Sequence, residues 1–286
     1  MKNYFFSLKK FVVKKLALDV FDDILIEKIK SMVHIISAEE TLEQITYFLI
    51  NNKQGVYMRF GDGDIFLLKN VDDGFQKSNQ LLSLEMEEAL SLSGAGIFKC
   101  LAIHSDLFGY SDGMLKGNHK VSNFLAKKLL KDSCKFFVGS NIYSPVALHF
   151  TATNEPLKAN SFLKLLKQKT KIVVGNEFLS DKTKSVLFHK DVVHIKTPSK
   201  NAYNEIDRVE QETLSALENI QNFSVIVVAM GCSGRPFMKR IWKKNFNVFL
   251  FDFGSLLDGI EGNNTRTWLK INQIDYNLLL TDLDKV

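Results

Sequence analysis

Short apolar runs alternate with longer amphipathic stretches along most of this chain. The run Val225-Ile226-Val227-Val228 is typical of the former. Because these runs are continuous, they indicate strands that are covered on both faces, as in parallel sheets flanked by helices. The expected strands are 55–60, 97–103, 135–139, 171–175, 191–195, 224–230 and 247–253. The expected helices are 39–51, 65–69, 81–92, 121–131, 161–169, 202–219 and 236–244. This order predicts a doubly wound α/β fold with a mostly parallel, Rossmann-like sheet.

The first residues form a separate pattern. Phe5, Leu8, Val12 and Leu16 follow one helical stripe within residues 4–18, and lysines flank this stripe. One interpretation is a helix on an anionic membrane surface, and the other is a helix docked on its own domain. We expect an N-terminal helical extension over 1–52 and a catalytic domain over 53–286.

Charge and composition narrow the function. The chain has 286 residues, 45% hydrophobic and 24% charged, with a net charge of +5. Residues 1–18 carry five lysines and no acid, which leaves 32 basic against 32 acidic residues elsewhere. A neutral body argues against a nucleic-acid partner. Three widely spaced cysteines form no CxxC pattern, and no apolar run is long enough for a membrane helix, so we expect a cytoplasmic protein.

Ligands of such sheets bind at the carboxyl ends of the strands. The first expected strand ends in RFGDGD, where Asp62 and Asp64 can present hard oxygens to Mn²⁺ or Mg²⁺. Gly61 and Gly63 allow close approach of a ligand, and Arg59 suits a phosphate. The alternative is an acidic turn in which Asp64 caps the following helix.

The segment GCSGRP (231–236) follows the strand expected over 224–230. The free N–H groups of Gly231, Ser233 and Gly234 would bind an anion at a helix N-terminus that begins with Pro236. The segment is neither a dinucleotide fingerprint nor a P-loop. The alternative is that these glycines serve only a tight turn.

Two further strand ends carry polar residues. Asn201, with Lys200, can contact a base, ribose or phosphate, or can simply cap a helix. Asp252 and Asp258 can supply a general base or orient a sugar hydroxyl, or can be solvated loop acids.

A further polar pair, His104 with Asp106, follows another expected strand. Structural hydrogen bonding is the alternative interpretation of this pair.

Three segments resemble one family. GVYMRFGDGD (55–64) resembles the RFGDGE signature of the GT-D fold glycosyltransferases, a group first catalogued as a domain of unknown function. HIKTPSKNAYNEID (194–207) resembles their P-x-x-N-A-[FY] segment, and residues 229–258 resemble their closing strand–loop–helix–strand with an apolar-Asp-apolar-Gly end. The three segments lie in the family order, between Gly55 and Trp268. Asp64 stands where the family has Glu, and Ser255 stands where close members often carry His.

The resemblance implies a nucleotide-sugar-dependent enzyme. Asp62 and Asp64 would hold Mn²⁺ or Mg²⁺ on the diphosphate of a donor, expected to be a UDP-sugar. An inverting reaction would use Asp258, or second Asp252, as base. The acceptor would be a saccharide or lipid-linked saccharide in bacterial surface-polysaccharide (capsule) or glycoprotein assembly, with the enzyme in the cytoplasm or on the inner face of the membrane. The alternatives are a metal-dependent phosphate-ester hydrolase and a non-catalytic nucleotide-sugar-binding domain.

Overall fold

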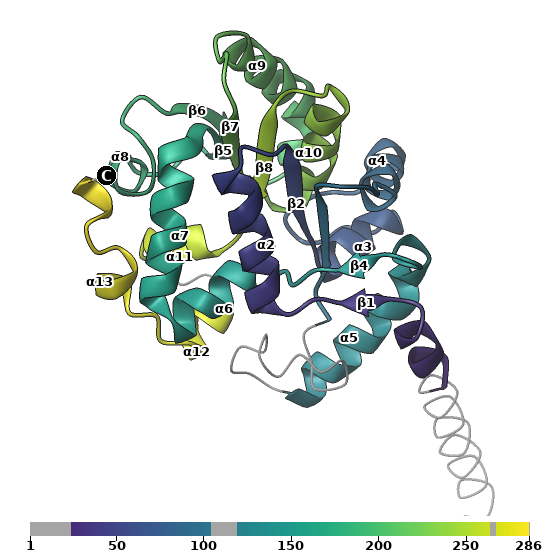
Figure 1. Ribbon diagram of the computed structural model, residues 1–286. Coiled ribbons are helices and arrows are strands. Elements are labelled where there is room, and N and C mark those ends of the chain that lie inside the picture. Colours follow the sequence, from purple (N-terminus) through teal and green to yellow (C-terminus); the bar gives the residue numbers. More distant parts are fainter. Residues whose placement is uncertain (1–23, 104–118, 264–266, 286) are drawn as a thin grey trace, which may run out of the picture.

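The fold is built on a six-stranded sheet in which every pair of neighbouring strands is parallel (Figure 1). The structure is a computed structural model that describes residues 24–103, 119–263 and 267–285. The strand order is β3-β2-β8-β7-β5-β6, and β1 and β4 form a small parallel pair beside it. The strands are β1 His34–Ile35, β2 Gly55–Phe60, β3 Ile97–Leu101, β4 Asn141–Ile142, β5 Thr170–Asn176, β6 Val193–Thr197, β7 Ser224–Ala229 and β8 Val248–Asp252.

Helices connect the strands and cover both faces of the sheet. The α-helices are α2 Ala38–Ile50, α3 Asp62–Leu68, α4 Gln80–Leu90, α5 His119–Ser133, α6 Ala147–Asn154, α7 Pro156–Lys169, α8 Asp181–Leu187, α9 Ile206–Glu218, α10 Gly234–Lys243, α11 Leu256–Ile260, α12 Thr267–Ile271 and α13 Tyr276–Leu279. Residues 24–30 are helical as well. The described residues also include the short 3-10 helices η2 Cys134–Phe136, η3 Ala202–Glu205, η4 Gly231–Ser233 and η5 Leu283–Lys285.

Two hydrophobic clusters lie on opposite faces of the sheet. One packs α3, α4, α5, α9 and α10 against one face, and the other packs α2, α6, α7, α11 and α13 against the other. Strand β2 shows how the sequence serves both: Val56 and Met58 belong to the first cluster and Tyr57 to the second. Side chains of a strand point alternately to its two faces, so a continuous apolar run suits a strand covered twice. The prediction of a doubly wound, mostly parallel α/β fold is confirmed.

Six of the seven predicted strands are confirmed, and the one at 135–139 is wrong. That segment forms η2 followed by a turn, in which Gly139 has a φ of +71° and the Val138 side chain is 50% exposed. Its apolar run is short and does not pair with the six-stranded sheet. The small strand β4 follows it instead, next to β1.

The N-terminal helix predicted over 4–18 lies outside the described residues. Helix α2, which the sequence analysis assigned to the N-terminal extension, packs into the main core through Leu42, Ile45 and Leu49. Among the helices of the described part, none has the length and apolar character needed to span a membrane.

Candidate functional site

The turn from β2 into α3 places two carboxylates in different surroundings. Asp64 is 2% exposed, and its Oδ2 accepts a hydrogen bond from the Gly61 N–H at 2.7 Å. Asp62 is exposed, and its Oδ1 accepts from the Gly63 N–H at 2.9 Å. Asp64 does cap α3, but from its third position, by accepting from the N–H of the N-cap Gly61; it does not precede a helix at residue 65, because the helix begins at Asp62. Of the two carboxylates, Asp62 is the one open to a ligand.

Arg235 brings this turn together with the end of β8. Its Nε lies 3.2 Å from Asp64 Oδ1 and its Nη1 lies 3.1 Å from Asp252 Oδ2. These are ion-pair contacts, and neither carboxylate oxygen has a hydrogen bond within the described part of the chain. Arg235 Nη1 also donates to the Gly231 carbonyl, and its Nη2 donates to the Arg59 carbonyl. One guanidinium therefore joins the ends of β2, β7 and β8.

Burial dominates the electrostatics of this cluster. Loss of water raises the pKa of Asp64 to about 6, although the charge of Arg235 and the Gly61 amide oppose the rise. Burial would lower the pKa of Arg235, but the charges of Asp252 and Asp64 outweigh it, so that the pKa lies above its ordinary value. Arg235 is therefore a fixed cation. The motif GCSGRP contains Arg235, but the sequence did not indicate this residue as part of the site. The feature that could have indicated Arg235 is its position directly after Gly231–Gly234, the loop that was expected to bind an anion.

Arg59 extends from β2 toward the loop that follows β8. Its Nε donates to the Pro145 carbonyl at 2.5 Å, and its Nη1 lies 3.9 Å from Asp252 Oδ1. Gly254 has a φ of +65°, and a Cβ atom at that position would overlap the Arg59 guanidinium. Glycine is thus required at 254 both for its backbone conformation and for the space that Arg59 fills.

The loop after β7 passes through Met230 to Gly231, whose φ is +57°, and continues through η4 into α10. Helix α10 begins at Gly234, two residues before the predicted Pro236. The Ser233 side chain is buried and donates from its Oγ to Gln76 Oε1 at 2.9 Å. In the described structure this hydroxyl is thus engaged by the protein. Gly231 is exposed, and the N-terminal end of α10 lies at the carboxyl end of β7, as an anion site requires.

Asn201 has a role that the sequence did not indicate. It stands at the N-cap position of η3 in a left-handed conformation with a φ of +54°, but its side chain makes no cap hydrogen bond. Its Oδ1 instead accepts from the Lys77 N–H at 2.8 Å, and its N–H donates to the Phe75 carbonyl. Lys200 is exposed beside it. A contact of Asn201 with a base, ribose or phosphate stays a prediction. Residues 72–78, which contact both this loop and the loop after β7, were missed because they carry no recognisable motif.

The end of β8 separates the two candidate bases. Asp252 is 4% exposed and pairs with Arg59 and Arg235, so it is no solvated loop acid. Asp258 is half-buried in the first turn of α11. Ser255 precedes that helix, and its Oγ accepts a hydrogen bond from Trp268 Nε1 at 2.8 Å. The predicted pair His104 and Asp106 lies outside the described residues.

Asp62 is the carboxylate of this turn that is open to a divalent cation. No cluster of three or more His, Cys, Asp or Glu side chains suited to a metal lies within residues 24–103, 119–263 and 267–285. Mg²⁺ commonly uses one or two carboxylates, substrate phosphates and water, which an exposed Asp62 could join. Both oxygens of Asp64 already contact Gly61 and Arg235. The prediction that Asp62 and Asp64 together hold the metal stays a prediction.

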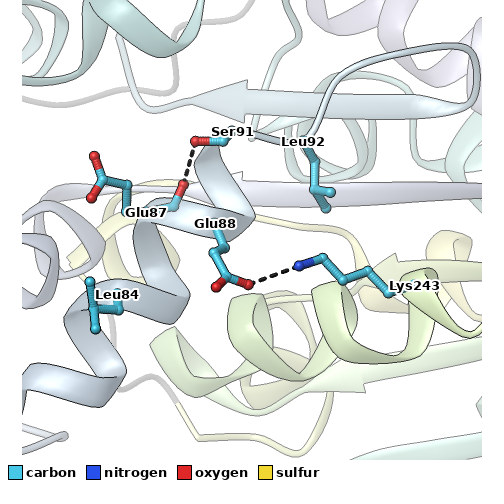
Figure 2. A pocket seen from close by; sticks show the side chains of 6 residues that line it. All are labelled: Leu84, Glu87, Glu88, Ser91, Leu92 and Lys243. Carbon is cyan, nitrogen blue, oxygen red and sulfur yellow. Dashed lines mark hydrogen bonds and ion pairs between the residues drawn. The ribbon is translucent and has the colours of Figure 1, made fainter.

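A cavity of about 420 Å³ lies away from this cluster, between the C-terminal parts of α4 and α10 (Figure 2). Its lining includes Glu88, whose carboxylate pairs with the Lys243 ammonium at 2.9 Å. Lys243 and Arg235 stand eight residues apart on α10, which corresponds to about 12 Å along the helix axis. The cavity is therefore at the opposite end of α10 from the site.

Comparisons with solved structures identify the fold class. A structure described as a new glycosyltransferase (DUF1792) from Streptococcus sanguinis aligns with a TM-score of 0.59 and 19% identity, over 87% of this chain and 93% of the other. A second, described as domain of unknown function 1792 with a distinct glycosyltransferase fold, aligns with a TM-score of 0.59 and 18% identity, over 90% and 92% of the two chains. The chain thus has a glycosyltransferase fold.

The family follows from the sequence model described as "Glycosyltransferase GT-D fold", which matches residues 57–261. This chain belongs to the GT-D glycosyltransferase family, and the resemblance noted from the three segments is confirmed. The comparison with curated proteins gave no match.

Proposed function

We propose that this protein is a metal-dependent glycosyltransferase that moves a sugar from a nucleotide sugar, expected to be a UDP-sugar, to a saccharide or lipid-linked saccharide. The observation that carries the proposal is the placement of Asp62. Asp62 is exposed just beyond the carboxyl end of β2, which is where parallel α/β sheets bind their ligands. The chain also belongs to the GT-D family.

Each polar group near Asp62 has a distinct task in this proposal. The N-terminal end of α10 and Arg59 would supply positive potential toward the diphosphate, while Arg235, paired with Asp64 and Asp252, holds the surrounding strand ends in place. Asp62 would hold Mn²⁺ or Mg²⁺ against the phosphates. When bound, the cation neutralises charge that develops on the departing nucleotide.

Whether the acceptor hydroxyl needs a base depends on whether the reaction inverts or retains the configuration of the transferred sugar. For an inverting reaction we propose Asp258 as the base that takes the proton of the acceptor hydroxyl, because Asp252 is committed to the two arginines. A retaining reaction needs no base at that place. We propose a role in bacterial surface-polysaccharide or glycoprotein assembly, on the cytoplasmic side of the membrane.

The experiment is a screen of nucleotide sugars with Mn²⁺ that measures nucleotide release with and without saccharide acceptors. Asp62→Ala is expected to abolish turnover while circular dichroism and thermal unfolding stay unchanged. The control is Asp191→Ala, because Asp191 is exposed and precedes β6, at the opposite edge of the sheet. Full activity of Asp62→Ala would contradict the metal role. Release of phosphate from simple esters without a sugar donor would instead favour the hydrolase.

A further inference from the structure

Residues 72–78, which we call the tie segment, run between α3 and α4 and fold around two aspartates. Asp73 Oδ1 accepts from the N–H groups of Phe75 and Gln76, and Asp72 Oδ1 accepts from the N–H and the hydroxyl of Ser78. These local bonds fix the conformation of the segment without regular secondary structure.

Gln76 connects two loops of the site through one oxygen atom. Its side chain is buried, and its Oε1 accepts from Ser233 Oγ at 2.9 Å and from the Tyr203 N–H at 3.0 Å. Its Nε2 donates to the Lys77 carbonyl. Ser233 belongs to the loop after β7 and Tyr203 to the loop after β6. A buried acceptor that satisfies two donors holds both at a fixed separation, because losing it would leave them unpaired.

Two other contacts repeat the connection. Cys232 Sγ lies 3.0 Å from Asp73 Oδ2, beside Gly63 of α3. On the other side, the Asn201 N–H donates to the Phe75 carbonyl and Asn201 Oδ1 accepts from the Lys77 N–H. The tie segment thus makes contacts with GCSGRP and hydrogen bonds with PSKNAY, and it lies beside Gly63 of RFGDGD.

The sheet alone does not set the distance between these loops. Strand β5 lies between β6 and β7, so no ladder of backbone hydrogen bonds joins the two strands directly. The loops after β6 and β7 extend beyond the ends of their strands. Their relative position therefore depends on contacts above the sheet, and the tie segment supplies them.

We propose that Gln76 is a positioning residue that holds the loops after β6 and β7 at the separation that the nucleotide of the donor requires. This inference rests on the proposed function, since it takes these loops as the binding site for a nucleoside diphosphate. Gln76 acts through Ser233 and Tyr203 and does not itself touch the ligand.

The test compares two buried amides. Gln76→Met keeps the length of the side chain and removes its acceptor. Asn160→Leu is the matched control: Asn160 is also buried and makes two hydrogen bonds, to the Leu279 and Thr281 carbonyls, on the opposite face of the sheet. UDP binding with Mn²⁺ is measured by titration calorimetry, thermal unfolding is measured in parallel, and hydrogen exchange at residues 201–204 and 231–234 reports on the two loops.

Both variants are expected to unfold at lower temperature. Only Gln76→Met is expected to weaken UDP binding, by about tenfold, and to speed exchange in both loops. Unchanged affinity in Gln76→Met, or an equal loss in Asn160→Leu, would overturn the positioning role. If Gln76→Met does not fold, Ser233→Ala takes its place, because it removes only one of the two donors to Gln76. The same criteria apply, and the expected loss of UDP affinity is smaller. A wild-type protein that binds no UDP would overturn the proposed function and this inference with it.

Discussion

Arg235 Nε lies 3.2 Å from Asp64 Oδ1, between two side chains that are 12% and 3% exposed. The same guanidinium lies 3.1 Å from Asp252 Oδ2, so one cation is shared by two buried acids from different parts of the chain. A buried pair of this kind adds little net stability, but removing one partner leaves a charge without compensation. The pair therefore fixes the geometry of the β2–α3 turn relative to the end of β8.

Replacing Arg235 should be costly for this reason. Arg235→Met leaves Asp64 and Asp252 without their shared cation, and we expect the free energy of unfolding to fall by about 3–5 kcal/mol. Arg208→Met is the control, because Arg208 is exposed and pairs with Glu205, just before α9, and with Glu212 in α9; the free energy of unfolding should fall by at most about 1 kcal/mol. Urea unfolding measures both, and equal losses would contradict the importance of the buried network.

Gly254→Ala should displace Arg59. The new Cβ would overlap the Arg59 guanidinium, and alanine is strained at a φ of +65°. Gly262→Ala separates these effects, because Gly262 has a φ of +83° but no atom within 4 Å of a Cβ. We expect a loss of about 1–2 kcal/mol from backbone strain in both variants, and weaker UDP binding only in Gly254→Ala. Calorimetry that finds the same UDP affinity in both would argue against a role of Arg59 in binding.

Lys99 should make stability depend on pH. Its ammonium is buried and donates to the carbonyls of Leu90, Leu92 and Phe136, and burial lowers its pKa from 10.5 to about 8. Between these two pH values the unfolded chain binds more protons at Lys99 than the folded chain. The free energy of unfolding should therefore rise with pH across that window, by on the order of 1–3 kcal/mol from this group.

Comparison of the wild type with Lys99→Met isolates this contribution. The substitution leaves three carbonyls without their donor, so it should lower the free energy of unfolding by about 1–3 kcal/mol. Urea unfolding of both proteins from pH 7.5 to 10 gives the difference in stability. This difference should grow with pH in favour of the wild type. Parallel curves would show that Lys99 titrates normally in the folded protein.

One of the two interpretations of the five lysines of residues 1–18 is a contact with anionic lipid, and a deletion tests it. Deleting these residues should reduce binding to vesicles that contain anionic lipid, by about 1 kcal/mol for each lysine near the surface, and the loss should shrink at high salt. Sedimentation with vesicles of neutral lipid is the control. Binding that the deletion leaves unchanged would exclude the membrane-surface interpretation in favour of a helix docked on its own domain.

Periodicity and glycine placement were enough to predict the sheet and the edge at which to look for a ligand. A continuous apolar run such as Val225–Val228 is typical of a strand that is buried on both faces of the sheet. Polar residues follow the ends of such runs, which marks the edge of the sheet where a ligand can bind. The strand predicted at 135–139 is wrong because a short apolar run does not by itself specify a neighbouring strand with which to pair. The short helices α6, α8 and α11 were missed because tertiary packing stabilises them more than their own pattern does.

Local patterns in the sequence were sufficient to predict the fold class, the family and the strand end that carries Asp62 and Asp64, because each of these depends on residues that are close together in the chain. Only the tertiary structure decided which charges meet. Arg235 reaches Asp64 across 171 positions of chain, and Gln76 reaches Ser233 across 157. Asp64 and Asp252 are carboxylates like Asp62 in the sequence, yet burial pairs both with Arg235. Contacts between residues this distant arise from the packing of strands and loops, which no local pattern records.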